Sequence, residues 1–260
     1  MITDRPTLRS GVEVLSSVAV LADASAERFV AAAEHAIATH GRFVVALSGG
    51  STPRATYERL AREPLARRID WSRVHIVWGD ERCVAPDDPD SNYKMARDTL
   101  LDRVPLPAAN IHRIRGEEPP DRAAESYEVV LRTLLRTPTG PPSSDPARRI
   151  DLVLLGLGDN GHTASLFPER PALDELSRWV VAAHVNAIPP WRVTMTLPLL
   201  NAAAELLFIV AGTDKADVLN RVRRGPPRPR ELPAQLIAPT SGRVRWLVDA
   251  EAAAQLGESV

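Results

Sequence analysis

The sequence predicts an α/β fold, a mostly parallel sheet with helices on both faces in a Rossmann-like arrangement. Short β-branched apolar runs alternate with segments of helical periodicity along most of the chain. The runs are apolar throughout, as expected of strands that helices cover on both sides, and right-handed crossovers join such strands. Polar, glycine-rich segments follow some of the runs, and ligands of open α/β sheets bind outside the carboxyl ends of the strands.

The first elements are two short apolar runs and an alanine-rich segment. Residues 12–15 and 18–21 are predicted strands. Asp23 is expected to cap the helix that follows them. Gly41 is expected to end that helix, because glycine readily adopts the left-handed conformation found after helix C-termini.

The alternation continues through the middle of the chain. Residues 43–47 predict a buried strand, and a helix is expected to follow it through Leu60. Residues 74–78 are the next predicted strand. Ser91 is expected to cap a helix that runs to about Asp102.

The second half of the chain keeps the same pattern. Helices are predicted over 121–136 and around 213–223. Strands are predicted at 151–155, 179–185, 193–196, 206–211 and 244–248. Two proline-rich stretches, 137–146 and 225–229, are expected to be surface loops. Either could link two domains, but the alternation continues across both, so residues 1–260 are expected to form one domain.

The composition excludes several classes of protein. The chain has 260 residues and a formal net charge of −1, from 32 basic and 33 acidic residues, so no charge excess favours nucleic acid or a membrane surface. The single cysteine, Cys83, excludes an internal disulfide framework and suits a reducing cytoplasm. The N-terminus shows no targeting segment, and no apolar run approaches the roughly 20 residues that cross a bilayer. We expect a cytoplasmic monomer or weak homo-oligomer.

The first candidate site directly follows the 43–47 strand. Its residues are Ser48, Gly49, Gly50, Ser51 and Thr52. The glycines let the backbone approach a ligand closely, Thr52 is a plausible N-cap, and Pro53 fits the first helical position. The free N–H groups of that helix would bind an anion, most naturally phosphate, although a plain tight turn explains the same residues. No Gly-Lys-Ser/Thr follows, so the segment is not a P-loop.

The second candidate site is the charged segment after the 74–78 strand. Asp80 could transfer a proton and Arg82 could clamp an anion, while a solvated charged loop is the simpler explanation of Asp80, Glu81 and Arg82. No histidine lies at metal-ligand spacing from these carboxylates, which argues against a metal site.

The third candidate site, the loop at 156–168, is the most specific. Its first six residues match the dinucleotide fingerprint G-x-G-x-x-G directly after a predicted strand. Pro168 leaves too little room for the helix that this fingerprint requires, and no acidic residue ends the next predicted strand. The context therefore argues against a nicotinamide cofactor.

What remains is a glycine-rich loop that presents a histidine at the carboxyl end of a strand. Gly158, Asn160 and Gly161 are expected to shape this loop and orient His162. The other histidines fall on predicted helices, strands or ordinary turns. No G-x-S-x-G nucleophile elbow is present, which argues against a serine hydrolase.

Six segments stand out as a set: LSGGSTP (47–53), WGDER (78–82), SNY (91–93), GLGDNGHTASLFP (156–168), RVTMTLP (192–198) and GTDK (212–215). Together and in this order they resemble the 6-phosphogluconolactonase family, of the wider glucosamine-6-phosphate deaminase/isomerase fold. The resemblance covers most of the chain, and the combination is far more specific than any one segment.

The resemblance implies hydrolysis of 6-phospho-D-glucono-1,5-lactone to 6-phosphogluconate in the oxidative pentose phosphate pathway, with no metal and no cofactor. It implies that His162 is catalytic, and that the substrate phosphate contacts the 48–52 segment, Arg192 and Lys215. A histidine with an ordinary pKa of about 6.5 can take a proton from water and return it to the ring oxygen of the lactone. Arg82 or loop N–H groups could stabilise the oxyanion, so general-base attack by water is the expected mechanism.

Two positions bear on the choice between activities, and a third departs from the pattern of the whole family. The related deaminases have a glutamate where this chain has Phe167 and an aromatic residue where it has Arg82, and both differences favour a lactonase. The aspartate usual two residues before the histidine is Asn160 here, and a neutral amide favours the imidazolium less than a carboxylate does. Either Asp159 or another acid substitutes for it, or the base has a lower pKa.

Two alternatives remain besides the lactonase. One is a sugar-phosphate deaminase or isomerase of the same fold, and the other is a non-catalytic sugar-phosphate sensor. A sensor that regulates transcription needs a DNA-binding module, for which a sheet beginning near residue 12 leaves no room.

Overall fold

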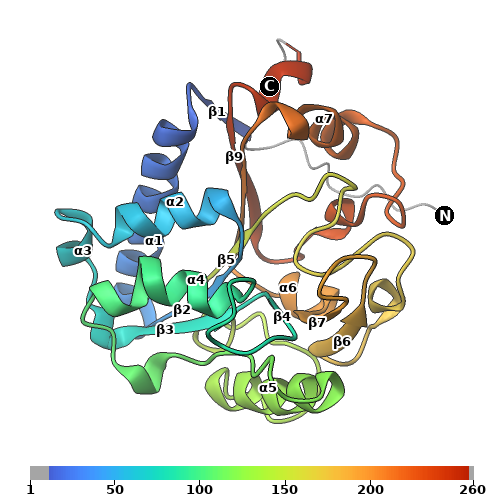
Figure 1. The fold of residues 1–260 in the computed structure, drawn as a ribbon. Coiled ribbons are helices and arrows are strands. Elements are labelled where there is room, and N and C mark those ends of the chain that lie inside the picture. Colours follow the sequence, from blue (N-terminus) through green and yellow to red (C-terminus); the bar gives the residue numbers. More distant parts are fainter. Residues whose placement is uncertain (1–11, 258–260) are drawn as a thin grey trace.

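The computed structural model describes residues 12–257, which form two β-sheets with helices packed around them (Figure 1). In the larger sheet six strands follow the order β1-β9-β8-β5-β2-β3, and every neighbouring pair is parallel. These strands are β1 (Val12–Leu15), β2 (Phe43–Leu47), β3 (Val74–Trp78), β5 (Leu152–Leu155), β8 (Glu205–Val210) and β9 (Arg243–Asp249). The predicted α/β fold with a mostly parallel sheet is confirmed.

A smaller antiparallel sheet has the order β4-β7-β6. Its strands are β4 (Asp80–Arg82), β6 (Val180–His184) and β7 (Trp191–Met195). The expected charged loop at 80–82 is therefore wrong. Three charged residues have no intrinsic preference for a strand, and β4 exists because β7 offers it a hydrogen-bonding partner.

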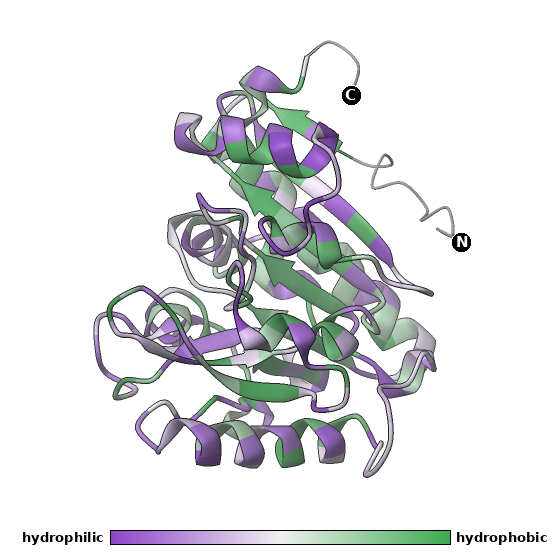
Figure 2. Ribbon diagram, turned by 90° about the vertical axis from the view of Figure 1, so that its right-hand side faces the viewer, coloured by the Kyte–Doolittle hydropathy of each residue, from purple (hydrophilic) through white to green (hydrophobic). Residues whose placement is uncertain are grey.

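The helices surround both sheets. They are α1 (Val18–His40), α2 (Ser51–Leu60), α3 (Leu65–Arg68), α4 (Asn92–Thr99), α5 (Pro120–Leu134), α6 (Leu197–Leu200) and α7 (Ala216–Arg224). Helix α1 contacts α2, β2 and β9, whereas α5 covers β6 and β7 of the smaller sheet. Figure 2 shows the apolar strands inside and the alternating polar and apolar stripes of α5, as expected where one helix face is buried. None of the helices in the part of the chain described is long and apolar enough to cross a membrane.

The start of α1 differs from the prediction. Residues 18–21 belong to the helix rather than to a strand, because the buried residues of α1, from Leu21 onward, recur at helical spacing. Ser17, not Asp23, is the N-cap, and its Oγ accepts a hydrogen bond from the Val20 N–H at 3.3 Å. The helix ends at Gly41 as predicted, with a left-handed φ of 85°.

Two other helices are shorter than predicted. Ser91 caps α4 as expected, its Oγ accepting a backbone N–H of the first turn at 3.1 Å. The α-helix ends at Thr99, however, and a separate 3₁₀ turn covers Leu101–Arg103. The predicted 213–223 helix likewise begins as a 3₁₀ turn over Thr213–Lys215, followed by α7.

Candidate active site

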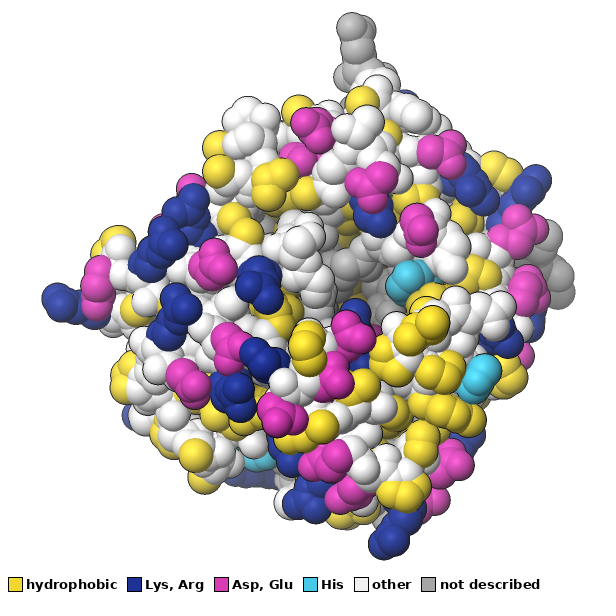
Figure 3. Space-filling view, viewed as in Figure 1, with side chains coloured by type: hydrophobic (Ala, Val, Ile, Leu, Met, Phe, Trp, Pro, Cys, Tyr) yellow, Lys and Arg dark blue, Asp and Glu magenta, His cyan; other side chains and the backbone are white. Residues whose placement is uncertain are grey.

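A cavity of about 680 Å³ opens where β2, β5 and β8 end, and it hollows the face of the molecule seen in Figure 3. Parallel strands present their carboxyl ends at one edge of a sheet, so loops far apart in sequence meet there. Every predicted site residue except Gly161 lines the cavity: Ser48, Gly49, Gly50, Ser51, Thr52, Asp80, Arg82, Gly158, Asn160, His162, Arg192 and Lys215.

The turn after β2 depends on a neighbouring side chain. A Cβ atom at Gly49 would lie 1.9 Å from Oδ1 of Asn92, so the missing side chain makes room for an amide from α4. Gly50 has a φ of 108°, a conformation that favours glycine. Gly49 still lines the cavity, and the approach of a ligand to its backbone stays a prediction.

The N-terminus of α2 faces the same cavity. Its N-cap is Gly50, so the predicted cap Thr52 lies inside the first turn, where Pro53 also sits without losing a hydrogen bond. No side chain of the described residues caps this helix. Its first N–H groups and its dipole are therefore available to an anion.

Tyr57 fixes the start of this turn. Its hydroxyl accepts a hydrogen bond from the Ser48 N–H at 3.0 Å and donates one to the Ser48 carbonyl at 2.9 Å. The Oγ of Ser48 is buried without a partner among the described residues. A buried hydroxyl costs free energy while unpaired, so a polar ligand in the cavity would gain by bonding to it.

Strand β4 places its charges on opposite sides, because successive side chains of a strand alternate between faces. Asp80 and Arg82 line the cavity. The Glu81 carboxylate instead accepts hydrogen bonds from the N–H groups of Asn92 at 2.7 Å and Tyr93 at 2.8 Å. Glu81 therefore stabilises the start of α4 and does not face a ligand.

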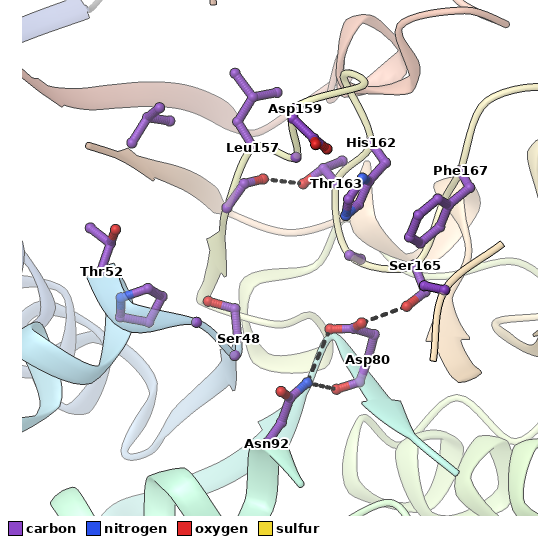
Figure 4. Close-up of a pocket in the computed structure, with 18 of the residues that line it drawn as sticks. Ser48, Thr52, Asp80, Asn92, Leu157, Asp159, His162, Thr163, Ser165 and Phe167 are labelled. Atoms are coloured by element: carbon purple, nitrogen blue, oxygen red, sulfur yellow. Dashed lines mark hydrogen bonds between the residues drawn. The ribbon is translucent and has the colours of Figure 1, made fainter. Parts of the chain in front are cut away.

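Two residues that the sequence did not single out hold Asp80. Ser165 donates a hydrogen bond from Oγ to Oδ2 of Asp80 at 2.6 Å, and Asn92 donates to the Asp80 carbonyl at 3.0 Å (Figure 4). Both residues line the cavity. They lie within segments that carried the family resemblance, but the fold alone brings them to Asp80.

Asn160 orients the imidazole of His162. Its Oδ1 lies 2.6 Å from Nδ1 of His162 and also accepts the backbone N–H of His162 at 3.2 Å. An amide oxygen only accepts hydrogen bonds, so Nδ1 carries the proton of the neutral ring. The lone pair is then on Nε2, which is the atom able to take a proton.

A glycine and a phenylalanine pack against the imidazole of His162. A Cβ atom at Gly158 would lie 2.0 Å from Nδ1 of His162, so only glycine leaves room for the ring. The Phe167 ring stacks on the imidazole at a centroid distance of 4.0 Å and an interplanar angle of 14° (Figure 4). Gly161, in the same loop, has a left-handed φ of 80° and packs against Leu232.

Burial lowers the pKa of His162 below its ordinary value and is the largest influence on it. The charges of Asp80 and Asp159 oppose this effect, and those of Lys215 and Arg192 add to it. Both alternatives considered for an asparagine at position 160 are therefore represented: Asp159 and Asp80 favour the imidazolium, and burial still lowers the pKa. The His162 ring therefore stays neutral, and able to act as a base, at a pH where an exposed histidine is already protonated.

Cationic side chains gather at the cavity wall. Arg82 and Arg192 stand directly opposite each other on β4 and β7. Burial and then the charge of Arg82 lower the pKa of Arg192, whose guanidinium donates to the carbonyls of Pro189 and Trp191. Like charges opposite each other in a sheet repel, so an anion bound between them would be favoured.

Residues 12–257 contain no group of three or more histidine, cysteine, aspartate or glutamate side chains that could hold a metal ion.

Comparisons with known proteins show the family of the chain. A family profile described as "Glucosamine-6-phosphate isomerases/6-phosphogluconolactonase" matches residues 16–246. A 6-phosphogluconolactonase of Nostoc sp. is 40% identical over 250 residues, covering 96% of this chain and 99% of the relative. One of Synechocystis sp. is 43% identical over 222 residues, covering 85% and 88%. The structure of a 6-phosphogluconolactonase from Trypanosoma cruzi superposes with a TM-score of 0.84 at 28% identity, covering 97% of this chain and 99% of that one.

Proposed function

The chain belongs to the family of glucosamine-6-phosphate isomerases and 6-phosphogluconolactonases, and from that membership we propose that it hydrolyses 6-phospho-D-glucono-1,5-lactone to 6-phosphogluconate. The observation that carries the proposed mechanism is the His162 imidazole, protonated on Nδ1 by its bond to Asn160 and lining a cavity that also holds a free helix N-terminus. A base and an anion site in one cavity suit a phosphorylated substrate that reacts with water.

In the first step, Nε2 of His162 takes a proton from a water molecule whose oxygen attacks C1 of the lactone. The charge that develops on the carbonyl oxygen is stabilised by Arg82 or by N–H groups of the 156–168 loop. The buried Asp80 carboxylate favours the imidazolium that forms, since its charge raises the pKa of His162. We therefore assign Asp80 a role through its charge, while Ser165 holds its carboxylate in place by a hydrogen bond to Oδ2.

In the second step, the bond between C1 and the ring oxygen breaks, and the imidazolium returns the proton to that oxygen. The products are a hydroxyl on C5 and a carboxylic acid on C1, which ionises in water. The six-position phosphate binds at the N-terminus of α2, near Arg192 and Lys215, and places C1 at the histidine.

The proposal is tested by assaying the purified chain on freshly prepared lactone. We expect acid release well above the spontaneous rate of lactone opening, and no ammonia release from glucosamine 6-phosphate. The deaminase alternative needs a carboxylate at position 167, where the Phe167 ring stacks on His162 instead. Ammonia release without lactone hydrolysis would overturn the proposal.

Replacing Asn160 by aspartate is expected to move the acidic limb of the pH profile of kcat/KM to higher pH. The base must be neutral to act, and burial lowers the pKa of His162 in the present site. A carboxylate at the position of Oδ1, 2.6 Å from Nδ1, stabilises the imidazolium and so raises that pKa. Kinetics from about pH 5 to 8 measure the shift, because kcat/KM reports the ionisation of the free enzyme. An unchanged limb would refute a role for position 160 in setting the pKa of His162.

Replacing Lys215 by alanine is expected to raise KM at least about tenfold with a smaller effect on kcat, because a phosphate contact binds the ground state and the transition state alike. The matched control is Lys94→Ala. Lys94 is the other lysine of the chain and pairs with Asp98 on the surface of α4 at 2.5 Å. Steady-state kinetics of both variants separate the effect on KM from the effect on kcat, and a change in KM no larger in Lys215→Ala than in Lys94→Ala would contradict a phosphate role for Lys215.

A further inference from the structure

A second cavity, of about 340 Å³, lies at the end of the parallel sheet opposite to the candidate active site. It opens between α1 and the amino-terminal ends of β5, β8 and β9. Arginines from three segments line it, namely Arg28 of α1, Arg149 before β5 and Arg243 of β9. None of these residues takes part in the mechanism proposed above.

The buried Glu205 carboxylate sits among more positive charge than it can neutralise. Arg28 Nε lies 2.8 Å from Oε1, Arg243 Nε 2.6 Å from Oε2, and Arg245 Nε 3.4 Å from Oε1. Burial and then the charge of Arg28 lower the pKa of Arg245, and Arg243 lowers it further. Three guanidinium groups thus share one carboxylate.

The other carboxylate at the cavity does not offset this excess. Oδ1 of Asp151 lies 2.9 Å from Nε2 of His40, and its Oδ2 accepts the Val44 N–H at 2.8 Å. Both oxygens of Asp151 therefore already pair with groups of α1 and β2, and neither pairs with an arginine of the cavity. Arg149 has no carboxylate partner among the described residues, and its one hydrogen bond, to the Ser241 carbonyl, is long at 3.5 Å.

Two buried donors at the cavity have no acceptor. Nη2 of Arg28 and Nε of Arg149 are shielded from solvent and make no hydrogen bond within the described part of the chain. A buried charged donor without an acceptor lowers the free energy of unfolding. An oxyanion accepts hydrogen bonds from several guanidinium N–H groups at once, so it would satisfy both donors. The small side chains of Ala32 and Ala36 of α1 leave the space that such a ligand would fill.

We propose that this cavity binds a small oxyanion, the phosphate or carboxylate group of a small molecule, through Arg28, Arg149 and Arg243. The site is separate from the anion site at the N-terminus of α2, so ligand bound in the second cavity leaves the first one free for substrate. The proposal does not depend on the proposed function, since binding is measured without substrate or turnover.

The test is calorimetric titration of the full chain with inorganic phosphate and, separately, with malonate. The titrations use the Lys215→Ala background, so that binding at the active site is weakened. Arg149→Gln in this background is expected to weaken binding at the second cavity at least about tenfold, the usual result of losing a charge-assisted hydrogen bond. Arg149 is outside the Glu205 cluster, so this variant keeps the ion pairs that hold α1.

Arg148→Gln is the matched control, because it removes the same charge from an exposed neighbouring residue. Binding of phosphate, of malonate or of both shows which oxyanions the cavity accepts, and each result supports the site when Arg149→Gln weakens binding and Arg148→Gln does not. The proposal is overturned if neither anion binds, or if Arg149→Gln and Arg148→Gln bind equally well.

Discussion

Replacing His162 by glutamine is expected to lower kcat for lactone hydrolysis by about 10²- to 10⁴-fold, the usual contribution of a general base. Glutamine keeps a polar side chain of similar length in the space between Gly158 and Phe167, but it cannot accept a proton at neutral pH. KM should change little, because the phosphate contacts lie on other elements. Steady-state kinetics on fresh lactone, with circular dichroism to confirm folding, provide the measurement.

His184→Gln is the control for this experiment. His184 is an exposed residue of β6 that packs edge-on against Trp191, and it does not line the cavity. A loss of activity in His162→Gln no larger than in His184→Gln would contradict the general-base role. Trapping of a covalent acyl-enzyme with substrate would contradict direct attack by water.

The general position of the site could be predicted from the sequence because it follows from strand order. Apolar runs at 43–47 and 151–155 predict buried parallel strands, whose carboxyl ends share one edge of a sheet. The segments directly after them therefore had to meet, and they do. The same reasoning places Lys215 at this edge, after β8.

Contacts between distant segments could not be predicted in this way. The sequence predicts that Gly49 serves a ligand, and the structure shows that its lack of a side chain also makes room for Asn92, a residue of another helix. The strand at Asp80–Arg82 has no local signal and depends on β7, which follows it by more than a hundred residues. The second cavity likewise joins α1 to strands from the far half of the chain. Local patterns contain no information about such partners.

The start of α1 shows a second reason why prediction from local sequence fails. Its first residues include valines, which favour strands, so the local composition predicts a short strand. In the structure Val18 and Val20 are 45% and 42% exposed, so they contribute little to the core in either conformation. The Ser17 cap and the buried face of the following turns decide the outcome. The strand propensity of a few residues contributes less free energy than a helix N-cap together with a buried helix face.

Replacing Gly158 by alanine is expected to lower kcat by about 10²-fold or more, because a displacement of about 1 Å in a reacting group has that effect. The added Cβ would lie 2.0 Å from Nδ1 and 2.1 Å from Cε1 of His162. The Phe167 ring, stacked on the imidazole, restricts where the imidazole can move. A displaced imidazole loses the geometry of its bond to Asn160, and Nε2 leaves its position.

Gly156→Ala is a close control for this substitution. Gly156 belongs to the same loop, and a Cβ atom there would meet no heavy atom within 4 Å. Both substitutions add one methyl group at a backbone conformation that alanine can adopt, so they change the unfolded chain equally. Near-normal kcat in Gly156→Ala together with a large loss in Gly158→Ala would assign the effect to the imidazole. Equal kcat values for the two variants would mean that the position of the His162 ring does not control the rate.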